Sequence, residues 1–190
     1  MRVITGTARG KRLETRDGKA VRPTPERVKE ALFSIIQFEI EGRRVLDLFA
    51  GSGQLGIEAL SRGAKQTVFV DSSRESADVV RRNVELCGFQ DSAEIVNMDF
   101  AAYLTRNTEK FDIAFLDPPY RTGILERALP LAAEHMNKGG TIVCENPSDE
   151  AMMDSAGDFR CVRSYRYGKI ILTLYRRKDV ITGWKNPEQK

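Results

Sequence analysis

The sequence has few of the residues that metal sites and disulfide frameworks require. It contains a single histidine, His135, and three cysteines, Cys87, Cys144 and Cys161, which are far apart and form no CxxC pair. An odd number of cysteines at these spacings argues against a disulfide framework and against a zinc site. We therefore expect three small core side chains in a reducing, cytoplasmic compartment, and no bound metal.

Long apolar runs are also missing. No segment approaches the about 18 consecutive apolar residues that a membrane-spanning helix needs, and 30% of the residues are charged. The first residues, MRVITGTARGKRL, contain neither the apolar region nor the cleavage site of a secretory signal. We expect no membrane association and no secretion. With 190 residues, of which 41% are hydrophobic, one domain can bury a sizeable core.

The net charge of +3 conceals an uneven distribution. Residues 1–29 contain nine lysines and arginines against three acidic residues, and residues 160–190 contain nine against two, so the segment between them is acidic. Two basic ends predict a surface for a polyanion such as nucleic acid. Ordinary solvated charges are the alternative explanation of the same composition.

Segments with strand and helix patterns alternate from residue 44 onward, which predicts a parallel sheet with helices on both faces. Two further strand patterns, 159–167 and 169–177, are separated by Gly168 and predict a β-hairpin at the edge of the sheet. The expected strands are 44–49, 67–71, 93–97, 112–117 and 140–145, and the expected helices are 54–62, 73–87, 99–106 and 123–136.

The first 24 residues predict an appendage to this domain. Residues 2–21 alternate β-prone pieces with glycines, which indicates a small β-hairpin. A helix follows, with Thr24 as its N-cap and Pro25 as its first residue, and extends to about Phe38. We expect an N-terminal arm at 1–24, a single domain at 25–178 and a loose tail at 179–190.

The clearest ligand motif is VLDLFAGSGQLG, residues 45–56. An apolar run, a carboxylate, small residues and the start of a helix predict a strand, a tight turn and a helix N-terminus. Gly51, Gly53 and Gly56 would allow the sharp turn and the close approach of a ligand. They match GxGxxG, and Asp71 lies at the end of the next predicted strand, as in the dinucleotide fingerprint. A nucleoside cofactor is expected.

Two features favour S-adenosylmethionine over NAD as that cofactor. Asp47 directly precedes the loop, where its charge would repel a pyrophosphate but attract the ammonium and sulfonium of an amino-acid cofactor. A second motif, Asp117-Pro118-Pro119-Tyr120, follows the predicted strand 112–117 and has no function in hydride transfer.

This second motif is suited to a planar amine. The prolines fix φ and remove two backbone donors, which leaves the carboxylate of Asp117 and the carbonyl of Pro118 as acceptors for the amine hydrogens. Tyr120 would stack on the base that carries the amine. A simple turn at the end of a strand is the alternative interpretation of the motif, and the presence of Asp47 and the glycine loop in the same chain argues against it.

Together, these segments resemble the amino-methylating S-adenosylmethionine-dependent methyltransferases. More closely, the chain is similar to the bacterial RsmD-type enzymes, which methylate guanine N2 in small-subunit ribosomal RNA. The matching segments are ITGTARGKRL, RPTPERVKEALFSI, DLFAGSGQLGIEALSRGA, VFVDSS, DPPY and YGKIILTLYRR. The resemblance implies a Rossmann-like class I methyltransferase fold, α/β, with a mostly parallel seven-stranded sheet, an antiparallel C-terminal strand and helices on both faces.

The resemblance also implies roles for individual residues. Asp71 would bind the ribose hydroxyls with Ser72 beside it, and Asp99 would accept from the adenine amine; a helix-cap role is the alternative for both acids. Glu145 ends a strand at the ligand edge, where a site role and a structural hydrogen bond are equally compatible with the pattern. The methionine end of the cofactor would contact Asp47, Phe49, Ala50, Gly51, Ser52 and Gly53, and Met98 and Phe100 would pack nearby.

Ribosomal RNA is the partner implied, free or within an assembling small subunit, and we expect a monomer. The target base would be flipped out or already unpaired. Arg22 and Thr24 match a family motif expected over the active site. Phosphate contacts are predicted, as a group, for Arg2, Arg9, Lys11, Arg12 and Arg27.

Three alternatives remain open from the residues themselves. Adenine N6 and cytosine N4 are planar amines like guanine N2, so only the resemblance selects guanine. A nicotinamide-dependent oxidoreductase would share the GxGxxG string and Asp71. A non-catalytic RNA-binding module would use the same basic ends.

Overall fold

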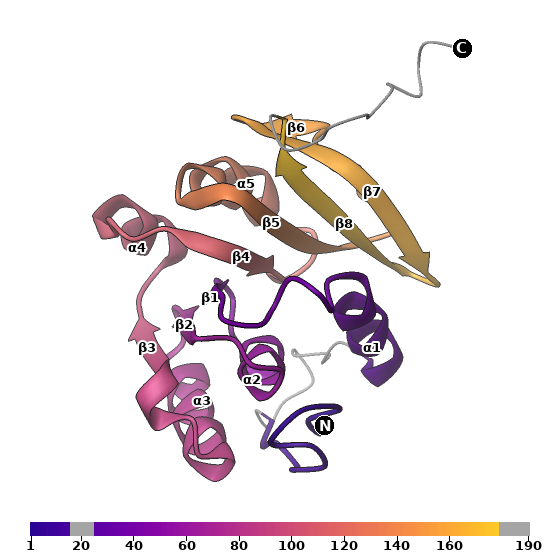
Figure 1. Cartoon of the computed structure of the whole chain (residues 1–190). Coiled ribbons are helices and arrows are strands. Elements are labelled where there is room, and N and C mark those ends of the chain that lie inside the picture. Colours follow the sequence, from indigo (N-terminus) through magenta and orange to yellow (C-terminus); the bar gives the residue numbers. More distant parts are fainter. Residues whose placement is uncertain (16–24, 179–190) are drawn as a thin grey trace.

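The computed structural model describes residues 1–15 and 25–178. These residues form one mixed β-sheet with helices on both faces (Figure 1). The predictions for Arg22, Thr24 and the tail at 179–190 lie outside the described residues.

The sheet contains eight strands within the described residues, in the order β3-β2-β1-β4-β5-β8-β7-β6. The first five strands in the chain pair in parallel, whereas β8 pairs antiparallel with both β5 and β7. The strands are β1 (Arg44–Asp47), β2 (Gln66–Asp71), β3 (Ala93–Asn97), β4 (Phe111–Leu116), β5 (Met136–Pro147), β6 (Ser155–Ala156), β7 (Phe159–Tyr167) and β8 (Ile170–Arg177).

The two faces of the sheet bury separate clusters of apolar side chains. Because side chains alternate along a strand, Val45 and Ile113 pack with α1, α2 and α3, whereas Leu46 and Ala114 pack with α4 and α5. The helices are α1 (Glu26–Ile35), α2 (Gln54–Ser61), α3 (Arg74–Cys87), α4 (Phe100–Arg106) and α5 (Ile124–Glu134), with a 3₁₀ turn, η1 (Gln90–Ser92).

The predicted fold class is confirmed. The seven-stranded pattern implied by the resemblance is present, and β6 adds a two-residue strand that pairs with the first two residues of β7. The predicted hairpin is β7–β8, but β8 lies inside the sheet between β5 and β7. None of the helices in the described parts of the chain is long and apolar enough to cross a bilayer.

Two local predictions were wrong. The first helix begins one residue later than expected, with Pro25 as the N-cap, because Pro25 has ψ 141° and is therefore extended rather than helical. It also ends at Ile35, and the chain reaches Phe38 through a turn. Cys87 and Cys144 are buried as expected, but Cys161 is only half-buried because β7 lies near the edge of the sheet.

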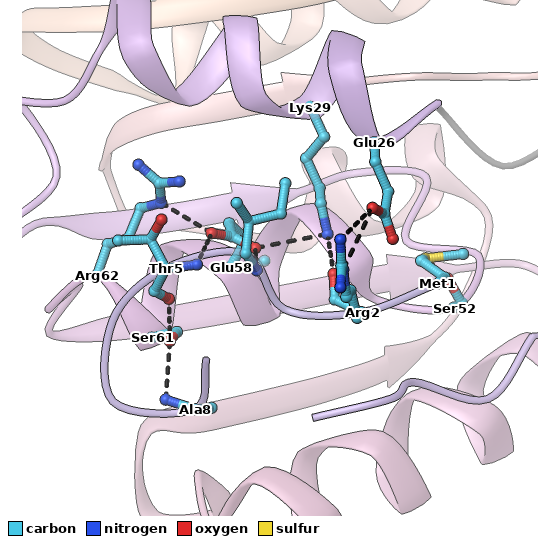
Figure 2. A network of polar contacts seen from close by, with 12 residues as sticks. Met1, Arg2, Thr5, Ala8, Glu26, Lys29, Ser52, Glu58, Ser61 and Arg62 are labelled. Carbon is cyan, nitrogen blue, oxygen red and sulfur yellow. Dashed lines mark hydrogen bonds and ion pairs between the residues drawn. The ribbon is translucent and has the colours of Figure 1, made fainter. Parts of the chain in front are cut away.

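The N-terminal arm, residues 1–15, folds back on itself and packs on α1, α2 and α3. The expected hairpin is reduced, in the described part of the arm, to a single antiparallel bridge between Arg2 and Arg12. The backbone N–H groups of Ile4 and Thr5 instead donate to the carboxylate of Glu58 on α2, at 2.8 and 3.0 Å (Figure 2). The arm is thus bound by hydrogen bonds to the helix that follows the glycine loop.

A buried ion pair supports this contact. The Lys29 ammonium lies 3.4 Å from the Glu58 carboxylate, and both side chains are fully buried. Lys29 also donates to the carbonyl of Arg2 at 2.6 Å, and Arg62 donates to Glu58 at 2.9 Å (Figure 2). Burial lowers the pKa of Lys29, and the charge of Glu58 opposes that shift. The arm, α1 and α2 therefore share one polar network.

Candidate active site

Four acidic side chains lie at or just beyond the carboxyl ends of parallel strands. Asp47 ends β1, Asp71 ends β2, Asp117 follows β4, and Glu145 is near the end of β5. Since these strands are parallel, their carboxyl ends form one edge of the sheet, hereafter the carboxyl edge. In open α/β sheets this is the edge where ligands bind.

The glycine loop connects β1 to α2 at the carboxyl edge. Gly51 has φ +56° and Gly53 has φ +76°, so both adopt the left-handed conformation that favours glycine. A Cβ on Gly51 would meet nothing within 4 Å, so the space beside it is open to a ligand. Gly56 differs, because a Cβ there would lie 2.2 Å from the ring of Phe69. The third glycine thus allows α2 to pack on the sheet.

Asp47 lies beneath the loop. Its side chain is only 2% exposed, and its carboxylate accepts from the backbone N–H of Gly56 at 2.9 Å. The pKa of Asp47 is raised to about 7, chiefly by burial; the Gly56 hydrogen bond opposes this shift, and the charge of Asp71 adds to it. A buried carboxylate of this kind is stabilised in its ionised form by a cation in the loop.

Asp71 holds the glycine loop directly. One carboxylate oxygen accepts from the backbone N–H of Gly51 and the other from that of Ser73, both at 2.8 Å. The N-cap of α3 is Ser73, whose hydroxyl accepts from the N–H of Ser76. Asp71 is therefore not the cap itself, and Ser72 is exposed beside it.

Asp99 is the N-cap of α4, which was the alternative considered for it. Its carboxylate accepts from the N–H groups of Ala101 and Ala102 at 2.9 and 3.2 Å. The ring of Phe100 packs 5.4 Å from the ring of Phe49, centroid to centroid. Met98 is half-buried nearby, and its N–H donates to the carbonyl of Asp71. The structure thus places the loop residue Phe49 next to the residues that follow β3.

The Asp117–Tyr120 segment leaves the sheet one strand away from Asp47. Pro118 is buried, Pro119 is exposed, and the Tyr120 ring is 38% exposed. The hydroxyl of Tyr120 donates to the carboxylate of Glu145 at 2.7 Å, which fixes the orientation of the ring. The next residue, Arg121, has φ +60°, an uncommon conformation for a residue other than glycine.

A cavity of about 340 Å³ adjoins this segment. Its walls are formed by residues 118–126, from the turn after β4 and the start of α5, and by residues 145–147 and 150–152, from the end of β5 and the following loop. Glu145, 4% exposed, lies on this wall and makes the Tyr120 hydrogen bond. The sequence left open a site role and a structural hydrogen bond for Glu145, and its position is compatible with both.

Gln54 is a site candidate that the sequence reasoning missed. It is the first residue of α2 and only 7% exposed, and its Oε1 atom is buried with no hydrogen-bond partner among the described residues. In the sequence, the only indication of a site role for Gln54 is that it directly follows Gly53 of the glycine loop. An acceptor held at the glycine loop is suited to an ammonium group of a ligand.

The predicted phosphate-binding residues lie at different ends of the molecule. Arg2 pairs with Glu26 in the first turn of α1, where Arg27 is also exposed, and Met1 lies 3.6 Å from Ser52 of the glycine loop. Arg12 bridges to Arg2, whereas Lys11 donates to the carbonyl of Leu86 near the end of α3. Arg9 follows the turn that packs on Ser61, the last residue of α2. The Arg9 and Lys11 backbones thus lie toward the edge opposite the glycine loop.

Within residues 1–15 and 25–178, no group of three or more His, Cys, Asp or Glu side chains is arranged to hold a metal ion. His135 caps the C-terminus of α5 and contacts Asn107 at 3.3 Å. Burial lowers the pKa of His135.

Comparison with known proteins identifies relatives over most of the chain. Residues 1–176 match the family model described as "Conserved hypothetical protein 95". The chain is 35% identical to ribosomal RNA small subunit methyltransferase D of Haemophilus influenzae, over 80% of this chain and 82% of that protein. It is 30% identical to the Escherichia coli K12 protein of the same name, over 94% and 90%. The solved structure of Escherichia coli yhhF superposes with a TM-score of 0.84 and 31% identity, over 93% and 97%.

Proposed function

The chain belongs to the family described as conserved hypothetical protein 95, and we propose that it transfers a methyl group from S-adenosylmethionine to the exocyclic N2 amine of one guanine in 16S ribosomal RNA. Relatives 30–35% identical to it carry the name ribosomal RNA small subunit methyltransferase D. That name supports ribosomal RNA as the substrate. Guanine N2 is the finer part of the proposal and rests on the sequence resemblance.

One observation carries the proposal: the glycine loop and the Asp117–Tyr120 segment emerge from paired strands. β1 and β4 are parallel neighbours, with Asp47 opposite Phe115. Asp117 follows Phe115 by two residues, so both acids reach the same part of the carboxyl edge. A donor bound at the loop and an amine bound at Asp117 would therefore meet, as direct transfer requires.

The residues around the glycine loop fit S-adenosylmethionine. The carboxylate of Asp47 and the buried Oε1 of Gln54, which has no hydrogen-bond partner within the described part of the chain, would hold the ammonium end. Asp71 retains acceptor sites for ribose hydroxyls beyond the two N–H groups that it binds. Phe49, Met98 and Phe100 form an apolar surface for the adenine. When bound, the cofactor supplies an electrophilic methyl group on a sulfonium.

The Asp117–Tyr120 segment would prepare the nucleophile. The lone pair of a base amine is delocalised into the ring, so the amine reacts poorly until its hydrogens are bound. The Asp117 carboxylate and the Pro118 carbonyl would accept those hydrogens and direct the lone pair toward the methyl group. Tyr120, whose ring is fixed by Glu145, would stack on the base, an interaction worth about 1–3 kcal/mol. The proton leaves the methylated amine to water.

A guanine in a duplex cannot enter such a site, because its N2 amine faces the minor groove. We propose that the target is flipped out or unpaired, in free RNA or in an assembling subunit, and that the enzyme acts as a monomer. Arg2, Arg12 and Arg27 are exposed near the carboxyl edge and would contact flanking phosphates. We also propose an arm at 1–24 and a catalytic domain at 25–178; the hydrogen bonds from Ile4 and Thr5 to Glu58 of α2 support an arm that packs on this domain.

Analysis of ribosomal RNA from a deletion strain tests this function. Mass spectrometry of the nucleosides from 16S RNA should show loss of one N2-methylguanosine, and a plasmid-borne copy of the gene should restore it. An Asp117→Ala copy should fail to restore it. Loss of a methylated adenine or cytosine instead would move the target to N6 or N4, and unchanged nucleosides would refute the assignment to ribosomal RNA. Binding of NAD in place of S-adenosylmethionine would favour the oxidoreductase.

A further inference from the structure

The β7–β8 hairpin has an unusual charge distribution. Residues 159–178 contain seven lysines and arginines and no acidic residue. Arg176 and Arg177, at the end of β8, form ion pairs with Glu39 and Asp158. The basic residues in the other half of the hairpin, toward the turn at Gly168, are Arg163, Arg166 and Lys169. Among the described residues these three form no ion pair, whereas two of the four basic residues at the other end do. More of the unpaired positive charge of the hairpin therefore lies toward the turn, where Asp149 offsets part of the charge of Lys169.

The turn of the hairpin lies at the carboxyl edge. β5 and β8 are antiparallel, and their register places Pro147, the last residue of β5, opposite Ile170. The N–H of Ser148 donates to the carbonyl of Lys169 at 2.9 Å. Because Pro147 also lines the cavity beside Tyr120, the turn is attached to the wall of the candidate base pocket.

Aromatic and basic residues alternate in the sequence of β7, with Arg166 on the opposite face from the rings, where it donates to the carbonyl of Gly168. Arg163, Tyr165 and Tyr167 lie on one face of β7, since they pair with Leu174, Leu172 and Ile170, which all belong to one core cluster. The Arg163 guanidinium is 5.2 Å from the centroid of the Tyr165 ring. Both tyrosines are half-buried, and Arg163 is exposed. Cations beside half-exposed rings are the composition that binds single nucleic acid strands.

The outer edge of β7 is also open along this stretch. β6 pairs only with Phe159 and Arg160, and within the described residues no other strand lies beyond β7. Figure 1 shows β7 and β8 side by side, with β7 outside β8 and beyond the helices that cover the centre of the sheet. Arginines on an open edge also discourage strand pairing. That role alone does not account for charges of a single sign or for their position beside the catalytic pocket.

Resting on the function proposed above, we infer that the turn of the β7–β8 hairpin binds the single RNA strand that flanks the target base. Arg163, Arg166 and Lys169 would contact its phosphates, and Tyr165 and Tyr167 would provide the apolar surface beneath it. The strand would run from this surface over the cavity wall formed by residues 145–147 and 150–152 to the base held at Tyr120. The RNA contact would thus involve the C-terminal hairpin in addition to the N-terminal arm.

The test compares two variants of the full-length protein with equal loss of charge. The first carries Arg163→Gln, Arg166→Gln and Lys169→Gln. The control carries Lys65→Gln, Arg106→Gln and Lys138→Gln, three exposed residues at the opposite edge of the sheet. Fluorescence anisotropy with a labelled single-stranded RNA gives the affinity over a series of salt concentrations, and calorimetry gives the affinity for S-adenosylmethionine.

The hairpin variant should bind RNA about 10–100-fold more weakly at low salt. The slope of log affinity against log salt concentration should decrease in magnitude by about 2, since three charges are removed and each phosphate contact to a single strand contributes about 0.7 to the slope. The control should match the wild type, and cofactor affinity should not change in either variant. If the two variants bound RNA with equal affinity, the inference would be overturned. Equal weakening would show an effect of net charge alone, and equal retention would show that the hairpin residues do not contribute to RNA binding. Failure of the proposed function would appear separately, as absence of methyl transfer by the wild type.

Discussion

The backbone N–H of Gly51 donates to the carboxylate of Asp71 at 2.8 Å, so the end of β2 directly supports the conformation of the glycine loop. The same carboxylate accepts from Ser73, at the start of α3. Asp71 thus connects three elements before any ligand is present. An ionised carboxylate has about four acceptor sites, so this structural role and the proposed ribose contact are compatible.

Asp71→Asn tests both roles of Asp71, its support of the glycine loop and its proposed contact with the cofactor. An amide has one acceptor oxygen where the carboxylate has two, so the N–H of Gly51 or Ser73 loses its partner. We expect a loss of about 1–3 kcal/mol of unfolding free energy, with weaker cofactor binding. Urea unfolding and calorimetry measure the two effects. Asp91→Asn, at an exposed site in η1, is the control, and equal stability of the two variants would contradict the structural role.

Asp117→Ala should slow methyl transfer while cofactor affinity survives. In the proposed reaction the carboxylate binds the amine and not the cofactor, and loss of one preorganised polar group of this kind costs about 10²–10³ in kcat. Single-turnover assays with labelled S-adenosylmethionine measure the rate, and calorimetry measures the cofactor affinity. Asp112→Ala, at the other end of β4, should leave kcat unchanged. Full activity of the Asp117 variant would refute the proposed mechanism.

Cofactor binding should depend on the ionisation of Asp47. Burial raises the pKa of Asp47 to about 7, so the carboxyl group of the free protein is largely protonated below that pH. A cationic ligand requires the ionised form, and its affinity should therefore fall as the pH decreases below 7, by up to tenfold per unit. Calorimetry between pH 5.5 and 8 should show this loss and proton release on binding. Asp47→Asn should bind weakly at every pH, and a flat wild-type profile would contradict the prediction.

The same shift has a defined effect on stability. The pKa of Asp47 is raised above its value of 3.8 in the unfolded chain, so between about pH 4 and pH 7 the folded state retains a proton that the unfolded state releases. Unfolding free energy should therefore decrease through this window as the pH rises. Asp47→Asn keeps an acceptor for Gly56 without the charge, so its stability relative to the wild type should increase over the same interval. A constant difference would contradict the raised pKa.

The sequence predicted the elements of the sheet well because their signals are local. The alternation of apolar runs, the glycines around Gly53 and the turn at Gly168 each specify a structure within about ten residues. The roles of Gly56 and Asp71 were only partly predictable, because they depend on Phe69 and on the loop, which tertiary packing brings near. Neither the Glu145–Tyr120 hydrogen bond nor the buried Lys29–Glu58 pair has a sequence signal, since each joins residues 25 or more positions apart.

The Lys29–Glu58 pair allows a test of the N-terminal arm. Glu58→Ala would leave the ammonium of Lys29 buried without its countercharge and the N–H groups of Ile4 and Thr5 without acceptors. Breaking a buried pair of this kind costs about 3–5 kcal/mol. The arm should also become susceptible to limited proteolysis, because its contacts with α2 depend on that carboxylate. Urea unfolding and mass spectrometry of the cleavage products measure these effects.

Two further variants distinguish loss of the pair from loss of a surface charge. Lys29→Met combined with Glu58→Gln removes both buried charges and should recover part of the stability lost in Glu58→Ala, because no uncompensated charge remains. Arg82→Ala breaks an ion pair with Glu14 in which both side chains are more than half exposed, and such a pair contributes at most about 1 kcal/mol. If Glu58→Ala were no more destabilising than Arg82→Ala, the arm would not depend on the buried pair for its position.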